Sequence, residues 1–594
     1  MSRICPSVTK PNNNEVMKGA SIMANKNLFA SPRTPVAPVA NTVNAAGGKA
    51  YSFEPRHAIA QIACTNCFNG TYYVSAEDNL KIAKDAAQAL IDDPLFLAKT
   101  AVYCRDKAYM KDMPAFLTVV LSQIDPKLFR KVFRRVIDNG KMLRNFIQMG
   151  RSGAITGKPI NMTSWAIKHA IRDWFDCMNG EALFKASIGN DPTMRDILRM
   201  ARPRPSSEAK AAMFAYLKGA EVRNGKLVTL AKNGEVYVNA QGVCYEHDYS
   251  LLPQLVQDYE NYKRTKEGTV PRVDFRMLDS LGIGPAEWKQ IARTAPWQMT
   301  RMNLNTFQRH DVLSDPELVQ VIAERLRDKK QIERARVFPY QLLMAFKAAT
   351  GVPTQISLAL QDAMEIAVQN VPKISGEMYV CVDTSGSMSS PATGYRMGAS
   401  SAVSCVDVAA LFAVTMLRTN EQANVIPFDT RTYKHDLNSR DSIMTNAQKL
   451  ARYGGGGTNC SLPLAELNAK KAKGDLVVFI SDNESWVDSG YSYAYGNATG
   501  LMTEWQTFKK RNPRAKLVCI DLTPRGSSQV KQHQDILQVG GFSDQVFQVI
   551  AGFMEGGDDA DHWVKVIENV SLDDASAAPV VNCNEEVVEE SAAE

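Results

Sequence analysis

Residues 377–387 read Glu377-Met378-Tyr379-Val380-Cys381-Val382-Asp383-Thr384-Ser385-Gly386-Ser387. The first six are mostly apolar, which is typical of a buried strand, and a polar turn follows the strand at once. Four more short apolar stretches, separated by segments of helical length, lie further along: Asn424 to Phe428, Leu476 to Ile480, Lys516 to Ile520 and Val546 to Ile550. This alternation predicts βαβ crossovers and a mainly parallel, doubly wound α/β sheet between about residues 375 and 568.

The turn that follows the first strand predicts a metal site. Its Asp-x-Ser-x-Ser pattern puts one carboxylate and two hydroxyls at the carboxyl end of a strand, where sheets of this kind place their sites. A glycine run at 454–457 and the strand at 476–480 lead to two further polar residues at strand-end loops. Oxygen ligands suit a hard divalent cation, Mg²⁺ before Mn²⁺ or Ca²⁺. The expected ligands are Asp383, Ser385, Ser387, Thr458 and Asp482.

Hydrolysis at this site is the weaker interpretation. A metal-assisted hydrolase needs a general base and a nucleophile beside the metal, and only Glu484 and Ser485 stand close in the sequence. The stretch Gly153 to Pro159 resembles a phosphate loop only superficially, because its gap is one residue short and proline replaces the hydroxyl that binds Mg²⁺. We therefore predict that the protein is not an enzyme.

Residues from about 51 to 370 are predicted to be mostly helical. Apolar residues recur there at three- and four-residue spacing, and the breaks between stretches are short, as between Pro114 to Ile124 and Leu128 to Ile137. Paired short helices favour a solenoid. One interruption differs, because alternating apolar residues flank Asn224-Gly225 and Asn233-Gly234, and this predicts a β-hairpin insertion at about 222–238.

Composition indicates the character of the two ends of the 594-residue chain and its cellular environment. Residues 1–50 are rich in Asn, Pro, Ala, Ser and Thr and are expected to form a disordered or loosely ordered leader, and residues 571–594 an acidic tail. No stretch has the length and apolarity of a membrane span, and no secretory pattern opens the chain. The eleven cysteines form no repeating framework, so we expect a reducing, cytoplasmic location.

The formal net charge of +6 is unevenly distributed. Between Lys127 and Arg172 there are eleven Lys or Arg residues against one acid, Asp138. Basic side chains on adjacent helices exchange condensed counterions for phosphates, so the pattern favours a nucleic-acid partner. Residues 164–176 read as one amphipathic helix, whose buried side is expected to include Trp165. We expect Trp288, Trp297 and Phe307 to be core residues rather than stacking platforms for bases.

Several blocks carry a resemblance to a known family. The stretches at 165–176, 179–183, 194–200 and 203–205 resemble the central block of the TROVE domain of Ro autoantigen proteins, and 337–345 resembles a later block. The metal residues resemble the metal-ion-dependent adhesion site (MIDAS) of von Willebrand factor type A domains. The resemblance spans about residues 51–568. Two features depart from it: Pro192-Thr193 stand where the family often has Ser-His, and the hairpin looks like an addition.

This resemblance implies a multidomain protein: an all-α, HEAT-like helical-repeat ring (TROVE) at 51–370, followed by the α/β type A domain at 375–568. In that family the basic outer surface of the ring holds small noncoding Y-type RNA, and the hole takes single-stranded ends of misfolded RNA, in RNA quality control or the stress response. The leading RNA contacts carried over are Lys168, Arg172, Arg195 and Arg199. Charge alone adds His169, Lys131, Arg134, Arg135, Arg144 and Arg202.

The resemblance also implies a use for the metal. The cation would keep one coordination position open for an acidic residue of a protein partner, such as an exoribonuclease, and the ring would be monomeric. An alternative of another class stays open: a metal-dependent protein-interaction or assembly factor whose basic solenoid binds acidic proteins.

Overall fold

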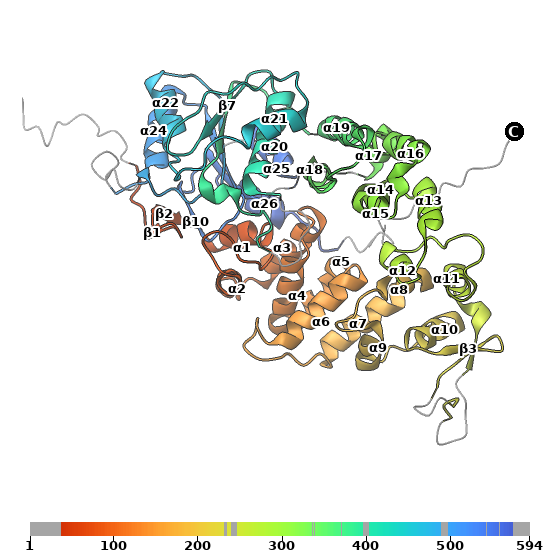
Figure 1. Ribbon diagram of the computed structural model, residues 1–594. Coiled ribbons are helices and arrows are strands. Elements are labelled where there is room, and N and C mark those ends of the chain that lie inside the picture. Colours follow the sequence, from red (N-terminus) through yellow and green to blue (C-terminus); the bar gives the residue numbers. More distant parts are fainter. Residues whose placement is uncertain are drawn as a thin grey trace, which may run out of the picture.

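A computed structural model describes residues 37–230, 235–238, 246–335, 337, 339–369, 371–395, 403–488, 497–541, 543, 545–556 and 559–573. Short helices follow one another round a ring, and an α/β domain completes it (Figure 1). This domain packs on the first helices of the ring, α1 and α3, and on its last, α18 and α19. The ring is therefore closed by the α/β domain, and the multidomain fold predicted from the sequence is confirmed. No helix of the described residues has the length and apolar character needed to cross a membrane.

The ring helices have the following bounds: α1 Pro55–Ala63, α2 Ala76–Gln88, α3 Pro94–Asp106, α4 Asp112–Ile124, α5 Pro126–Val136, α6 Gly140–Ser152, α7 Trp165–Cys177, α8 Gly180–Ala186, α9 Met194–Ala201, α10 Glu208–Leu217, α11 Gln254–Thr265, α12 Phe275–Asp279, α13 Pro285–Thr294, α14 Trp297–Met302, α15 Leu304–Arg309, α16 Pro316–Leu326, α17 Lys329–Ala335, α18 Pro339–Ala348 and α19 Thr354–Val368. Two single 3₁₀ turns, η1 Tyr249–Leu251 and η2 Val312–Ser314, join them.

Helix α5 shows how local sequence sets these elements. Asp125 caps its first turn by accepting hydrogen bonds from the backbone N–H groups of Lys127 and Leu128, both at 2.9 Å, and Pro126 occupies the first helical position. One face then buries Phe129 and Phe133 against Phe146 of α6, with ring centroids 5.2–5.8 Å apart. The opposite face is left to the basic side chains.

The sheet of the α/β domain has five parallel strands in the order β11-β9-β8-β6-β7. Helices α20, α21 and α25 pack on the face that continues into the core of the ring, and α22 and α24 pack on the other. The strands are β6 Met378–Asp383, β7 Ala423–Phe428, β8 Leu476–Ser481, β9 Lys516–Asp521 and β11 Ile536–Gly540. The remaining elements are η3 Gly386–Ser389, α20 Cys405–Thr419, α21 Ile443–Leu450, α22 Leu462–Ala469, α24 Gly500–Arg511, α25 Gln545–Glu555 and α26 His562–Glu568.

Four of the five predicted strands are confirmed, and the fifth is wrong. Residues 546–550 lie in helix α25, while the fifth strand is β11. In α25 the buried residues are Val546, Phe547, Val549, Ile550 and Phe553. This is the spacing of one helix face, and a window of five apolar residues is too short to distinguish it from a buried strand.

The predicted leader is wrong from residue 37 onward. Strands β1 Thr42–Val43 and β2 Lys49–Ser52 pair with each other, and β2 also pairs with β10 Ser527–Ser528 of the α/β domain. Ala50 and Tyr51 are buried by this pairing. The partner strand stands almost five hundred residues away, so composition near the N-terminus gave no sign of it. Residues 1–36 lie outside the described residues.

The insertion is a three-stranded sheet, not a hairpin. The Asn224-Gly225 turn joins β3 Glu221–Arg223 to β4 Lys226–Val228 as predicted, and the third strand is β5 Glu246–Asp248. The predicted arm around 235–238 contributes one isolated bridge, between Leu230 and Val236, within the described residues. Asn233-Gly234 and the acidic tail from residue 574 lie outside the described residues.

Candidate metal centre and nucleic-acid interface

The carboxyl ends of β6 and β8 bring two aspartates to one edge of the sheet. Asp383 is the last residue of β6 and Asp482 directly follows β8, and these strands are parallel neighbours. The Asp383 carboxylate accepts hydrogen bonds from the Ser481 hydroxyl at 2.5 Å and from the Ser385 backbone N–H at 2.9 Å. The turn is thereby held with its oxygens converging beside the strand end.

The hydroxyls of the turn belong to the same cluster, and the glycine loop packs against the turn. The Oγ atoms of Ser385 and Ser387 are 3.2 Å apart, and both residues are buried. The Gly455 N–H donates to the Thr384 carbonyl at 2.8 Å, so the loop that leads to buried Thr458 lies directly against the turn. Gly454 has φ +84°, and a Cβ there would come within 2.1 Å of the Thr384 oxygen. Only glycine permits this approach.

The electrostatics of the cluster suit a cation. Burial, and then the charge of Asp482, raise the pKa of Asp383 to about 7. The described residues contain no group of three or more His, Cys, Asp and Glu side chains placed to hold a metal. The cluster offers two carboxylates with hydroxyls instead, a sparse oxygen set of the kind that Mg²⁺ uses while it keeps several waters. The residues therefore fit such an ion.

The two side chains weighed as hydrolytic groups have structural partners. Glu484 makes a buried ion pair with Arg525 at 2.8 Å and also accepts the Ala46 N–H at 3.0 Å. The Ser485 hydroxyl donates to Asp488 at 2.9 Å and accepts the Cys460 N–H at 3.0 Å. Each side chain ties one loop to another part of the chain, and these contacts account for its burial.

Tyr73 is a neighbour of the metal cluster that sequence reasoning missed. It lies before α2, in the ring, and its hydroxyl is close enough to the Ser387 side chain to be influenced by it. Burial, and then the charge of Asp482, raise the pKa of Tyr73 to about 12. The Arg525 guanidinium lies 5.2 Å from the centre of the Tyr73 ring and donates to the Thr71 hydroxyl at 3.2 Å. Through Tyr73, the helical ring thus lies directly against the metal cluster.

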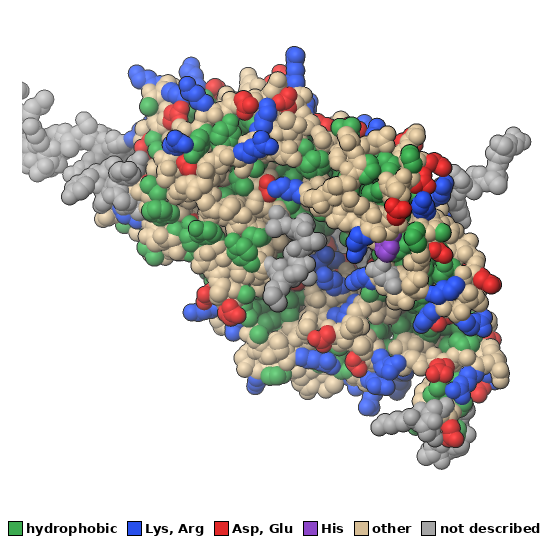
Figure 2. Space-filling model, in the orientation of Figure 1, with side chains coloured by type: hydrophobic (Ala, Val, Ile, Leu, Met, Phe, Trp, Pro, Cys, Tyr) green, Lys and Arg blue, Asp and Glu red, His purple; other side chains and the backbone are tan. Residues whose placement is uncertain are grey.

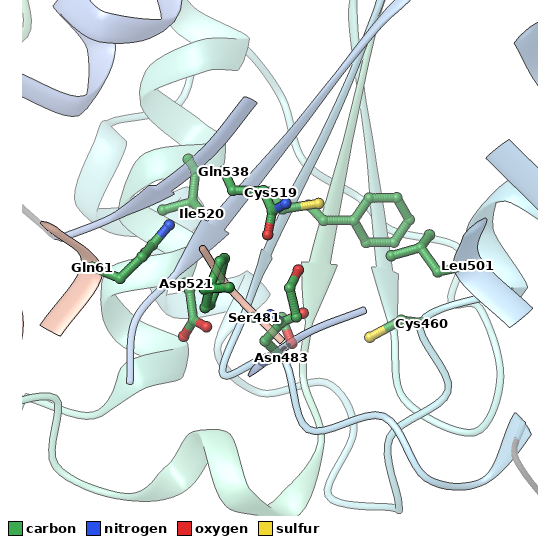
Figure 3. A pocket seen from close by; sticks show the side chains of 12 residues that line it. Gln61, Cys460, Ser481, Asn483, Leu501, Cys519, Ile520, Asp521 and Gln538 are labelled. Atoms are coloured by element: carbon green, nitrogen blue, oxygen red, sulfur yellow. Dashed lines mark hydrogen bonds between the residues drawn. The ribbon is translucent and has the colours of Figure 1, made fainter. Parts of the chain in front are cut away.

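A small pocket lies behind the metal cluster, between helix α1 and the sheet (Figure 3). Ser481, the donor to Asp383, lines it together with Gln61, Asp521 and Gln538. Each of these last three has a buried side-chain atom without a hydrogen-bond partner among the described residues. Buried polar groups of this kind are ordinarily satisfied by enclosed water.

Three neighbouring helices present most of the predicted RNA contacts. Helix α7 packs against both α5 and α9 (Figure 1), and each of these three helices carries several of the predicted basic residues. Figure 2 shows Lys and Arg side chains gathered on this part of the molecule, including the central hollow close to α5. The exposed side chains are Lys131, Arg134, Arg195, Arg199 and Arg202, and those half-buried are Arg135, Lys168, His169 and Arg172.

Arg144 is not part of this surface. It is only 9% exposed, and its guanidinium donates to the carbonyl of Ala186 at 2.9 Å, where α8 ends. Burial, and then the charge of Arg276, lower its pKa. The prediction from charge alone was wrong here, because the side chain closes a helix end rather than facing solvent. Arg172 has a mixed role, since its Nε donates to Ala201 O at 2.8 Å and anchors the end of α9.

Trp165 was expected on the buried side of α7, and this too is wrong. It is the first residue of the helix and is 65% exposed. The Arg130 guanidinium lies 4.9 Å from the centre of its ring, and the His169 ring packs against it with centroids 4.5 Å apart and an interplanar angle of 32°. An aromatic platform therefore stands within the basic surface. The other three aromatic side chains are buried as predicted: Trp288, Trp297 and Phe307.

Comparisons with known proteins agree with this arrangement. Residues 377–554 match the family model described as the Ro60 vWA domain. The RNA-binding protein RO60 of Caenorhabditis elegans is 24% identical over 202 residues, which cover 32% of this chain and 30% of that protein. The match thus spans less than a third of the curated relative. The crystal structure of the Deinococcus radiodurans RO (RSR) protein covers 85% of this chain and 100% of its own, with a TM-score of 0.56 and 18% identity.

Proposed function

We propose that this chain, a member of the Ro family with a helical ring and a C-terminal von Willebrand factor type A domain, binds RNA through the basic faces of α5, α7 and α9. The RNA would be a small noncoding RNA of the Y type and single-stranded ends of misfolded RNA, in RNA quality control or the stress response. The protein would be a monomeric, cytoplasmic ribonucleoprotein component without enzymatic activity.

The observation that carries this proposal is the adjacency of the three basic helices. Side chains from separate stretches of sequence, such as Arg134, Lys168 and Arg199, are carried by three helices that pack on one another, and all three side chains are at least partly exposed. Such a surface neutralises several phosphates at once, and release of their counterions provides most of the affinity. The exposed Trp165 adds a face on which an unpaired base can stack. A basic surface with an exposed aromatic side chain suits RNA that has a single-stranded element better than an uninterrupted duplex.

A charge-removal experiment tests the proposal. Lys168→Gln, Arg195→Gln and Arg199→Gln together remove three contacts, so the slope of log affinity against log salt should fall by about 2 for single-stranded RNA. The probe is a fluorescent RNA hairpin with a single-stranded 3′ extension, followed by polarisation at several salt concentrations. A matched variant neutralises Arg309, Lys329 and Lys330 on α15 and α17, in the opposite arm of the ring, and should leave affinity unchanged.

The same experiment separates the alternative function. If the basic surface binds acidic proteins instead, the wild-type protein has no affinity for the hairpin that exceeds the weak, salt-labile binding of any cationic protein. An equal loss in both triple variants would mean that net charge, not this surface, binds the probe. Either result would overturn the proposal.

For the metal cluster we propose Mg²⁺ held by Asp383, Ser385, Ser387, Thr458 and Asp482. When bound, the cation would supply a coordination position for the carboxylate of a protein partner, such as an exoribonuclease. Support comes from the two buried aspartates, which need a compensating positive charge. Addition of Mg²⁺ should raise the melting temperature of the wild type but not of Asp383→Ala. Asp436→Asn, which changes an exposed carboxylate, is the control and should respond like the wild type.

A further inference from the structure

The segment that follows α26 ends on the basic face of α5. Helix α26 packs against α3 of the ring, and the chain then crosses to the neighbouring helix. There the Arg135 guanidinium donates to the carbonyl of Ser571 at 2.7 Å, and Lys131 makes an ion pair with Asp573. Leu572, between these two contacts, is half-buried against the ring core. Residues 571–573 are therefore placed along the surface assigned to RNA.

The sequence beyond this point complements that surface in charge. Residues 574–594 contain six acids and no Lys or Arg: Asp574, Glu585, Glu586, Glu589, Glu590 and Glu594. Within the described part of the chain, the exposed side chains of Lys127 and Arg134 on the same helix have no hydrogen-bond or ion-pair partner. Lys131 and Arg135, which already contact the segment, thus share α5 with Lys127 and Arg134, which are free to pair with it.

The geometry permits the whole acidic segment to stay there. Glu585 is twelve residues from Asp573, so even a fully extended chain carries it no further than about 40 Å, and a flexible one about 20 Å. Helix α5, with eleven residues, is about 16 Å long. The chain is thus long enough for the acidic side chains to reach the cations along the whole of α5.

We propose that residues 574–594 lie on the basic face of α5 and its neighbours and compete with RNA for it. This inference rests on the proposed RNA-binding function for its consequence, but not for the docking itself. Each exposed ion pair contributes little alone. The tether gives the segment an effective concentration in the millimolar range, and six charges act together. RNA of higher charge density displaces the segment, whereas weak, non-specific polyanions do not.

Photocrosslinking in the full chain tests the docking without RNA. Val588→p-benzoylphenylalanine places a reactive group between two acidic pairs of the segment. At low salt the crosslinks should map to α5 and α7, and they should disappear at about 0.5 M salt, where the Debye length is only a few Å. Crosslinks that map to the α/β domain, or that survive high salt, would overturn the proposal.

RNA affinity tests the competition. A neutral segment, with the five glutamates changed to Gln and Asp574→Asn, should bind an oligouridylate about three- to tenfold more tightly at low salt, and equally at high salt. The control changes Val580, Val581, Val587 and Val588 to Ser, which keeps every charge, and should behave as the wild type. Unchanged affinity of the neutral segment would refute the competition. Crosslinks on α5 in a protein that binds no RNA would refute the proposed function and leave the docking intact.

Discussion

Replacement of Trp165 by alanine should weaken RNA binding without weakening the fold. The side chain is 65% exposed at the first residue of α7, and its ring contacts are the Arg130 guanidinium and the His169 ring. An exposed cation–π contact contributes about 0.5–1 kcal/mol, and little apolar surface is lost from the core. The melting temperature of Trp165→Ala should therefore remain close to that of the wild type.

The expected loss of affinity follows from the stacking of one base. Alanine substitution of a stacking aromatic costs about 1–3 kcal/mol per base, which corresponds to about 5- to 150-fold in dissociation constant. Because Trp165 carries no charge, the salt dependence of binding should be unchanged. Lys168→Ala should do the reverse, with a slope lower by about 0.7. The two variants thus separate stacking from phosphate contacts.

The assay is polarisation of the labelled hairpin with its single-stranded extension, at several salt concentrations. Trp165→Phe should recover most of the affinity, since phenylalanine keeps a stacking face. Tyr395→Ala, which removes an exposed aromatic side chain of the α/β domain, is the control and should bind like the wild type. An affinity of Trp165→Ala within twofold of the wild type would refute the stacking argument, and so would a changed salt slope.

Three further outcomes are expected. Arg144→Met should lower the unfolding free energy by about 1–3 kcal/mol, because the Ala186 carbonyl loses a charged donor. RNA binding by the folded protein should stay normal. Thermal melting and polarisation measure these two outcomes. Burial lowers the pKa of His57, so the unfolded chain takes up the proton first, and stability falls as pH drops below about 6.5. Between pH 7 and pH 5, the melting temperature of His57→Gln should therefore fall less than that of the wild type. Tyr73→Phe frees Ser387 from a competing hydroxyl, and calorimetry should show Mg²⁺ affinity higher by about two- to tenfold; a lower affinity would mean that Tyr73 supports the cation.

The sequence predicted well what neighbours along the chain control. The strand before Asp383 is recognisable because parallel strands buried on both faces read as short apolar runs, and the polar turn follows it directly in the sequence. The short ring helices follow from local capping and apolar spacing, as in α5. The fifth strand was assigned to residues 546–550 instead of β11. An apolar run of five residues is too short for its periodicity to distinguish a helix from a strand.

The sequence showed that several stretches are basic, but it could not show how their side chains are arranged on the surface of the protein. The packing of α7 against α5 and α9 decided that the basic helices are neighbours, and the packing of α6 against α8 turned Arg144 inward to a helix end. Trp165, at the first position of α7, is left exposed rather than buried by the neighbouring helices. Helical periodicity says which residues share a face. It does not say how much of that face a neighbour covers.

By itself, then, the sequence determined the two architectures, their order and the polar turn after the first strand, because each depends on contacts within a few residues. Tertiary structure alone decided the pairing of β2 with β10, the approach of Tyr73 to Ser387 and the placement of residues 571–573 on α5. These contacts join residues separated by hundreds of positions. Their free energy comes from surfaces that exist only once the ring has closed on the α/β domain.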